Sequence, residues 1–259
     1  MAGTILDDIL GVAADRAADA ESRLPELMEG ARRQPPVRGF GRAIARSGLS
    51  VIAEIKRRSP SAGVISGALD PVSQAIAYEA GGADAISVLT EPEFFGGSLE
   101  DLEAVREAVA VPVLRKDFIV GPAQIWEARA AGSDAVLLIV AALGDETLAS
   151  LVAVATEVGV DAIVEAHTTE EVRRAVDARA EIIGVNNRDL ATFETDLSVA
   201  EGAAGAIPAG VITIGESGVS SVEGASRMHR AGYDAILVGE ALVRHEDPEA
   251  FVAALKAAR

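Results

Sequence analysis

The sequence predicts an α/β protein built as a single (β/α)8 TIM barrel with an N-terminal helical extension, and three observations support this. The chain has 259 residues, about the length that one such barrel needs. Eight short apolar runs alternate with stretches of helical periodicity, and no low-complexity linker divides them. A phrase of the type Gly-x-Asp-Ala-Ile recurs at 82–86, 132–136, 159–163 and 232–236. We therefore expect one domain over 1–259, with 1–48 as the extension and 49–259 as the barrel.

Each copy of the repeat marks a junction between a helix and a strand. The glycine closes a helical stretch, because glycine accepts the left-handed backbone of a helix end at little cost. The residues after the aspartate begin a short β-branched run, which is typical of a parallel strand buried on both faces. The repeat thus predicts alternating helices and parallel strands.

The elements follow one another at a regular spacing. Residues 1–48 indicate extra helices, with a break at Pro35-Pro36. Eight strands are then expected at 51–56, 85–89, 112–115, 135–140, 162–165, 182–186, 211–215 and 235–238. Apolar residues at helical spacing mark the helices between them, most clearly over 99–109 and 148–158. No GxGxxG follows the first strand, and eight units in one unbroken chain favour a closed barrel over an open, doubly wound sheet.

Composition excludes several classes of function. The chain has no cysteine, so it has neither disulfides nor thiolate metal sites, and its three scattered histidines argue against a histidine zinc site. A net charge of −17 disfavours nucleic-acid binding. No apolar stretch approaches the roughly 20 residues that cross a bilayer, and the acidic start does not resemble a signal peptide. We expect a cytoplasmic protein without metal, cofactor or membrane partner, and a monomer, since no oligomer interface is legible.

Charged and polar residues gather at one end of the predicted strands. In a parallel barrel the catalytic groups lie at the carboxyl ends of the strands and in the loops that follow. Apolar strands that carry ionisable groups at one end only are hard to explain by packing, so the pattern predicts an enzyme. These ends carry Glu54 and Lys56, Arg115 and Lys116, Glu165, Asn186 and Arg188, Glu216 and Ser217, and Gly239 and Glu240.

Lysine and asparagine are scarce and are placed at these ends. Only three of the 23 basic residues are lysine, and Lys56 and Lys116 both fall at the carboxyl ends of predicted strands. Lysine can lose its proton when it is desolvated, so it can act as a general acid where arginine cannot. The alternative is a pair of solvated loop cations. The chain's two asparagines, Asn186 and Asn187, stand together at the end of the sixth strand.

Two carboxylates lie on the apolar strands themselves. Glu54 is two residues from Lys56 and therefore on the same face of its strand. Glu54 and Glu165 are either a base and its partner or members of buried ion pairs that hold the barrel together. Arg188 is a candidate to clamp a carboxylate with two hydrogen bonds, or else forms a surface ion pair.

The last two strands and the loop aromatics suggest the substrate. Ser217-Gly218 and Gly239-Glu240 would let backbone N–H groups approach an anion, and a short helix after the eighth strand would point its positive end at it, as in a phosphate site. Four phenylalanines follow strands at this same end and form an apolar wall for a ring, or else a satellite core; they are Phe94, Phe95, Phe118 and Phe193. The residues thus predict a small anionic substrate with an apolar ring.

Four motifs resemble those of the indole-3-glycerol phosphate synthase family. They are IAEIKRRSPS at 52–61, LRKDF at 114–118, GVNNRDL at 184–190 and ESGV at 216–219. The first is long and specific, all four stand in the family's order, and the similarity runs from the N-terminal helices to about Glu249. The resemblance implies a (β/α)8 barrel that converts 1-(2-carboxyphenylamino)-1-deoxyribulose 5-phosphate to indole-3-glycerol phosphate, with loss of CO2 and water, in tryptophan biosynthesis.

The resemblance also implies roles for individual residues. Lys116 would protonate the substrate ketone while the ring carbon attacks it, and decarboxylation would restore aromaticity. Glu165 as base and Lys56 as acid would then complete the dehydration, with the two lysine roles shared or exchanged, and Glu54 would hold the lysines. Asn186, Arg188 and Ser217 would position the carboxylate and hydroxyls of the substrate.

The remaining implied residues bind the two ends of the substrate. The phosphate would lie at Ser59, Gly218, Gly239 and Glu240, with Lys56 nearby. The carboxylate of Glu240 would oppose a dianion unless it turned outward. The apolar substrate pocket is expected at Phe95, Phe118, Pro60 and Leu190.

Two other functions stay open at this point. Another phosphate-binding barrel, such as phosphoribosylanthranilate isomerase, would need a Cys/Asp-type acid–base pair, and the chain has no cysteine. A catalytically silent barrel that serves as a subunit or scaffold would need none of the charged strand ends.

Overall fold

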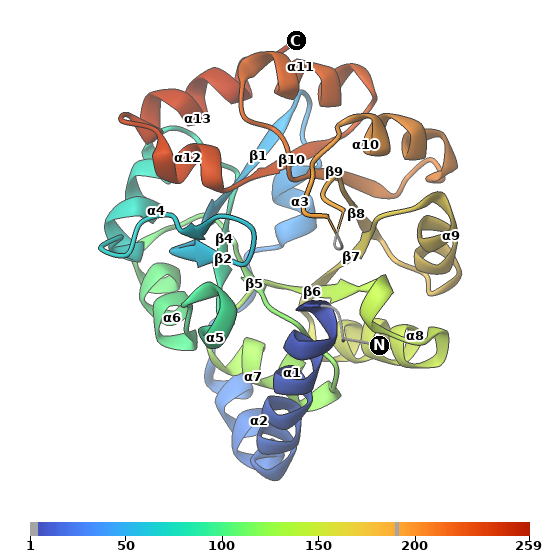
Figure 1. Ribbon diagram of the computed structural model, residues 1–259. Coiled ribbons are helices and arrows are strands. Elements are labelled where there is room, and N and C mark those ends of the chain that lie inside the picture. Colours follow the sequence, from blue (N-terminus) through green and yellow to red (C-terminus); the bar gives the residue numbers. More distant parts are fainter. Residues whose placement is uncertain (1–4, 190–191) are drawn as a thin grey trace.

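A computed structural model describes residues 5–189 and 192–259 of the chain. Within these ranges the barrel strands are β1 (Ser50–Ile55), β4 (Ala85–Leu89), β5 (Val113–Lys116), β6 (Ala135–Ile139), β7 (Asp161–Ala166), β8 (Ile182–Asn186), β9 (Ile212–Glu216) and β10 (Ala235–Val238). They close in the order β1-β10-β9-β8-β7-β6-β5-β4, and all neighbours are parallel. The fold is therefore the expected (β/α)8 barrel (Figure 1).

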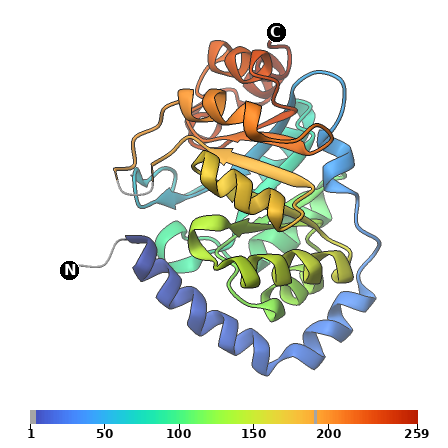
Figure 2. The same cartoon turned by 90° about the vertical axis from the view of Figure 1, so that its right-hand side faces the viewer.

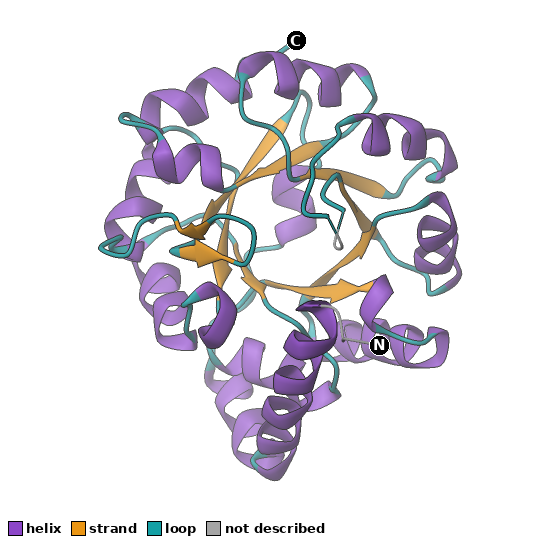
Figure 3. Ribbon diagram, in the orientation of Figure 1, coloured by secondary structure: helices purple, strands orange, loops and turns teal. Residues whose placement is uncertain are grey.

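Helices surround the ring of strands, as Figure 3 shows. Those that follow the barrel strands are α4 (Pro71–Ala80), α6 (Leu99–Ala108), α7 (Pro122–Ala130), α8 (Asp145–Val158), α9 (Thr169–Asp177), α10 (Ser198–Ala203), α11 (Val222–Arg230) and α13 (Pro248–Lys256). Shorter elements lie in the connections: a hairpin of β2 (Arg58–Ser59) and β3 (Gly63–Val64), α5 (Pro92–Phe95), η1 (Val140–Ala142), η2 (Ala204–Ala206) and α12 (Glu240–Arg244). The extension holds α1 (Ile5–Ser22), α2 (Leu24–Arg33) and α3 (Phe40–Ile44).

The core has two parts because side chains alternate between the two faces of each strand. Ile52, Leu114 and Ile163 belong to the cluster that fills the barrel. Val51 and Val136 belong to the cluster between the strands and the outer helices. Both faces are covered, and this is why the strands read as continuous apolar runs in the sequence.

The repeat has a structural reason at the amino end of the barrel. All four repeat glycines have left-handed backbones, with φ from 81° to 92°. Asp84 Oδ2 accepts a hydrogen bond from Val51 N at 3.0 Å, and Asp134 Oδ2 accepts one from Val113 N at 2.8 Å. In the same way Asp234 Oδ2 accepts one from a β9 backbone N–H at 2.8 Å. These aspartates tie the start of one strand to the start of its neighbour.

The extension closes that same end. Asp161, the remaining repeat aspartate, accepts a hydrogen bond from Gly41 N in α3 at 2.9 Å. Phe40 and Ile44 of α3 are fully buried inside the barrel. In Figure 2, α1 and α2 run along the outside of the barrel, and α3 lies at the opposite end from the β2–β3 hairpin. The amino end is therefore sealed and cross-linked, which leaves the carboxyl end open for chemistry.

The predicted elements are confirmed. Each expected strand agrees with the structure to within one residue at either end, and α6 and α8 occupy the two helical stretches singled out in the sequence. The helical extension is also present, as α1, α2 and α3. In the part of the chain that the structure describes, no helix is both long and apolar enough to pass through a bilayer.

Candidate active site

A cavity of about 420 Å³ opens at the carboxyl ends of the barrel strands. Charged side chains from β1, β5, β7 and β9 form its floor, and residues that follow β1, β4, β5, β8, β9 and β10 form its walls. Ile5, Leu6 and Ile9 of α1 also line it. The beginning of the N-terminal helix is thus part of the cavity wall as well as an outer layer of the fold.

Lys116 lies at the centre of a buried charge cluster. Its Nζ is 3.5 Å from Glu165 Oε2, 3.6 Å from Glu216 Oε2 and 4.0 Å from Glu54 Oε2. Burial by itself lowers the pKa of Lys116, but the charges of the surrounding carboxylates outweigh it and raise the pKa above the usual value. Lys116 is therefore a fixed ammonium whose hydrogens are directed by the carboxylates of β1, β7 and β9.

Lys56 supplies a second cation on the β1 side. Its Nζ lies 2.7 Å from Glu54 Oε1, as expected for two residues on the same face of one strand. Burial raises the pKa of Glu54, yet Lys56 and Lys116 together lower it below its usual value. Glu54 is thus an ionised bridge between the two ammonium groups.

Glu216 differs from the other two carboxylates. Burial and the charge of Glu165 raise the pKa of Glu216 well above its usual value. Glu165 shifts the other way: burial raises its pKa, but Lys116 and His167 outweigh burial and lower it. Of the three carboxyl groups, Glu216 therefore keeps a proton most readily.

Two glycines, one within β8 and one directly after β10, make room for these carboxylates. A Cβ atom at Gly184 of β8 would collide with Glu216 Oε1, and one at Gly239 would collide with Glu54 Oε1. Gly239 was expected only to bring backbone N–H groups close to an anion. The structure adds a second reason for a glycine at this position.

The predicted phosphate residues line the cavity near β9 and β10. Ser59, Gly218 and Gly239 belong to its wall, and α12 begins directly after Gly239, where a short helix was expected. Ser217 and Gly218 have left-handed backbones, with φ of 60° and 79°, so the chain turns sharply at the end of β9. Glu240 pairs with Arg244 one turn further along α12, at 3.0 Å, so its charge is partly neutralised. Arg244 also lines the cavity, and sequence reasoning missed it.

Aromatic rings form the apolar side of the cavity. The Phe95 and Phe118 ring centroids are 6.1 Å apart, and Pro60 and Phe193 belong to the same lining. Phe94, which we grouped with these aromatics, is not among the described residues that line the cavity. Its backbone N–H instead donates to Glu91, which caps α5.

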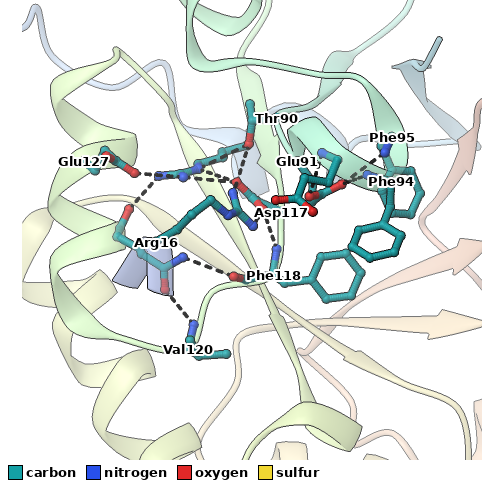
Figure 4. Close-up of polar contacts among 12 residues, drawn as sticks. Arg16, Thr90, Glu91, Phe94, Phe95, Asp117, Phe118, Val120 and Glu127 are labelled. Atoms are coloured by element: carbon teal, nitrogen blue, oxygen red, sulfur yellow. Dashed lines mark hydrogen bonds and ion pairs between the residues drawn. The ribbon is translucent and has the colours of Figure 1, made fainter. Parts of the chain in front are cut away.

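The cap that positions Phe95 is a buried carboxylate. Glu91 is fully buried, and its oxygens accept hydrogen bonds from three backbone N–H groups at the start of α5, at 2.6 to 3.0 Å. Capping of this kind fixes the first turn of a helix. Phe95 is the last residue of that turn, so the cap holds its ring at the cavity (Figure 4).

Comparison with known proteins agrees with this geometry. Residues 6–255 match the family model described as indole-3-glycerol phosphate synthase. The chain belongs to the indole-3-glycerol phosphate synthase family. The protein of that name from Kineococcus radiotolerans is 54% identical, over 98% of this chain and 96% of the relative. Those from Streptomyces griseus and Mycolicibacterium smegmatis are 51% and 50% identical, over 98% and 97% of this chain and 96% and 93% of theirs.

Solved structures support the fold more distantly. Thiamine phosphate pyrophosphorylase from Pyrococcus furiosus superposes with a TM-score of 0.59 at 15% identity, covering 80% of this chain and 93% of its own. N-acetylmannosamine-6-phosphate 2-epimerase from Clostridium perfringens gives the same TM-score and identity, over 76% of this chain and 88% of its own. At such low identity these likenesses establish the barrel alone.

In this member of the indole-3-glycerol phosphate synthase family, Lys116 and Phe118 flank an anchored aspartate. Asp117 accepts hydrogen bonds from both terminal nitrogens of Arg16, at 3.0 and 2.9 Å, and from Thr90 Oγ1 at 2.7 Å. Arg115, buried on the outer face of β5, adds a contact of 3.1 Å (Figure 4). The segment is thus held from outside the barrel while Lys116 points inward.

The two neighbouring asparagines have different positions. Asn186 lines the cavity, and its Oδ1 accepts a hydrogen bond from Arg188 N at 3.0 Å. Arg188 also lines the cavity, where its Nη1 donates to Phe193 O at 2.8 Å. Asn187 faces away and hydrogen-bonds to backbone groups of β9 and α10, among them Glu216 O at 2.9 Å.

The structure brings the site residues that the resemblance implies to this one cavity, apart from Leu190, which lies outside the described residues. Phe94, which was expected in the apolar wall, does not line it. Sequence reasoning missed Glu216 as a site residue, although its place at the end of a strand, directly before Ser217, was the available signal. It also missed the α1 contribution of Ile5, Leu6 and Ile9, for which the sequence offered no comparable signal.

Proposed function

We propose that the Lys116 cluster catalyses ring closure of 1-(2-carboxyphenylamino)-1-deoxyribulose 5-phosphate. The observation that carries this is one ammonium held by carboxylates from β1, β7 and β9 under a cavity with an apolar wall. Lys116 donates its proton to the ketone oxygen while the ring carbon that bears the carboxylate attacks the ketone carbon. An oxygen becoming an alkoxide is a stronger base than an amine, so an ammonium with a raised pKa can still protonate it.

The two remaining steps use the rest of the floor. Loss of CO2 from the attacked ring carbon restores aromaticity. Glu165 then takes a proton from the substrate, and Lys56 gives a proton to the departing hydroxyl group. The hydroxyl group leaves as water, and the indole double bond forms in the substrate. Glu165 is available as a base because its lowered pKa keeps it ionised, and Lys56 is held in place by Glu54.

The two ends of the substrate take opposite sides of the cavity in this proposal. Its ring lies against Phe95, Phe118 and Pro60, with Leu190 expected nearby. Its phosphate lies against backbone groups of Gly218 and Gly239. The polar residues Ser59, Asn186, Arg188 and Ser217, with Lys56, contact the phosphate, carboxylate and hydroxyl groups.

We further propose that the chain works as a cytoplasmic, monomeric, single-domain enzyme whose partner is this small phosphorylated molecule. The separation of its most exposed large apolar residues supports the monomer. Among the described residues these are Val64, Ile76 and Val222, and they lie on β3, α4 and α11.

The direct test is to incubate the purified chain with the carboxyphenylamino-deoxyribulose phosphate and to follow indole fluorescence. We expect product and release of CO2, at a rate unchanged by a metal chelator. Activity that fell with the chelator and returned with a divalent ion would contradict the metal-free reaction. No product would favour a silent barrel, and turnover of phosphoribosylanthranilate instead would favour the isomerase.

A further inference from the structure

His167 lies directly behind the proposed base. It is the first residue after β7, two positions beyond Glu165, so its side chain leaves the chain on the same side. Its Nε2 is 3.5 Å from Glu165 Oε1, and its Nδ1 is 3.3 Å from Glu171 Oε2. The ring therefore stands between a carboxylate of the cavity floor and a carboxylate in the first turn of α9.

Glu171 fixes this ring through two contacts. The same Oε2 atom that faces Nδ1 also accepts a hydrogen bond from the backbone N–H of His167 at 2.6 Å. Thr168 caps α9 by accepting a hydrogen bond from Glu171 N, and this fixes the backbone from which the Glu171 side chain extends. With Nδ1 directed at Glu171, the other ring nitrogen is aimed at Glu165.

That second nitrogen has no other contact to satisfy it. The His167 side chain is only 12% exposed, and its Nε2 is buried without a hydrogen-bond partner in residues 5–189 and 192–259. His167 is not among the described residues that line the cavity, whereas Glu165 is. Any effect of His167 on a bound molecule must therefore pass through Glu165.

The two oxygens of Glu165 face nitrogen atoms of two different side chains. Oε2 lies 3.5 Å from Lys116 Nζ, and Oε1 lies 3.5 Å from His167 Nε2. A carboxylate contacted at both oxygens cannot rotate without losing one contact. His167 and Lys116 together thus define the plane of the Glu165 carboxylate.

We propose that His167 is a positioning residue for Glu165, held by Glu171, and that it fixes the orientation and the proton affinity of this base. The proposal rests on the proposed function, in which Glu165 accepts a proton during dehydration. His167 does not touch the substrate.

The charges around this pair decide the sign of the effect. Glu165 faces Lys116, His167, Glu216 and Glu54, and His167 faces Glu165, Glu171 and the more distant Lys116; Arg174 in turn acts on Glu171. Burial lowers the pKa of His167, but the Glu171 hydrogen bond and the two carboxylates raise it above its usual value. A charged imidazolium favours the ionised form of Glu165. Without the charge of His167, Glu165 should release its proton only at a higher pH.

The test compares His167→Gln and His167→Leu with wild type in kcat–pH profiles measured at saturating substrate. Both variants lose the charge, so we expect the acidic limb of kcat to move to higher pH by about half a unit or more. Gln keeps a neutral donor near the Nε2 position, so its plateau kcat should stay within about threefold of wild type. Leu keeps no donor, and its plateau should fall about tenfold with KM within about twofold, because the substrate contacts are unchanged.

Two further variants separate this role from general damage. His245→Gln removes an exposed histidine outside the cavity and should leave both plateau and limb unchanged. If His167→Leu does not fold, Glu171→Gln provides the test. It removes the negative charge that faces the ring, so it should move the acidic limb of kcat in the same direction by a smaller amount. An unmoved acidic limb in His167→Gln and Glu171→Gln would overturn the proposal. Absence of turnover in wild type would instead defeat the proposed function.

Discussion

The two ends of the barrel use carboxylates in opposite ways. At the amino end, the repeat aspartates accept hydrogen bonds from backbone N–H groups of β1, β5, β9 and α3. At the carboxyl end, Glu165 and Glu216 lie against Lys116, and their Oε2 atoms have no hydrogen-bond partner in the described part of the chain. A satisfied carboxylate contributes stability, and one that is left short of partners is available for chemistry.

The lysines repeat this contrast. Lys256 lies at the amino end, where its Nζ donates to Gly82 O at 2.7 Å and to Asp84 Oδ1 at 2.8 Å. Lys116 at the carboxyl end has carboxylate neighbours at 3.5 to 4.0 Å and faces the cavity. The same residue type is thus a cross-link at one end and a candidate acid at the other, and four changes test this division.

The largest effect is expected from Lys116→Met. It should reduce kcat by at least about 100-fold, because a general acid contributes at least that much, while substrate binding and folding persist. Lys256→Met is the matched control and should lower the Tm with kcat nearly unchanged. More than about a tenth of wild-type kcat in Lys116→Met would remove this lysine from the chemical step.

Asp134→Ala should show the reverse profile. Asp134 is fully buried and accepts from Val113 N and from Arg38 N at 2.7 Å, with Arg106 paired to it at 3.2 Å. Its loss should reduce the free energy of unfolding by about 3 kcal/mol, because buried partners lose their acceptor. Denaturant titration gives this value, and kcat should stay within about twofold at temperatures where the variant is folded. The exposed Asp145→Ala should change neither. A loss of kcat in the folded Asp134→Ala enzyme would mean that the two ends are not independent.

Arg16→Met tests whether the extension supports the carboxyl end. Without its two hydrogen bonds to Asp117, the segment from Lys116 to Phe118 is held less firmly, and we expect kcat/KM to fall about tenfold. Arg33→Met, which removes an exposed pair with Glu29 of the same extension, is the control and should be silent. Equal kinetics for both variants would mean that Arg16 does not support the segment from Lys116 to Phe118 during turnover.

A small kinetic effect is expected from Glu216→Gln, because Gln mimics the protonated form that the raised pKa of Glu216 favours. We expect kcat within about threefold of wild type, against at least about 100-fold loss for Glu165→Gln.

The thermal stability of Glu216→Gln provides a second test. Above the unfolded pKa of a glutamate, the folded state keeps a proton that the unfolded state has released, so wild-type stability falls as pH rises toward the raised pKa. Glu216→Gln escapes this loss and should have the higher Tm at pH 7, with little difference near pH 4. A lower Tm at pH 7 would mean that Glu216 is ionised.

Sequence reasoning located both ends of the barrel for one physical reason. Parallel strands share a direction, so whatever follows each apolar run must gather at a single rim, and Lys56, Lys116 and Glu165 could be assigned to it from their order in the chain. The glycines of the repeat marked the opposite rim because their left-handed backbones are a local property.

Only the tertiary structure decided which of these groups touch. Arg16 and Asp117 are 101 residues apart, and no local pattern predicts that α1 will bring them together. Glu216 was visible at the end of its strand, but its contact with Lys116 and its raised pKa depend on the register across the closed barrel and on shared burial. Direction and periodicity are written in the chain itself, whereas distances across the barrel and the pKa values they set arise only when the ring of strands closes.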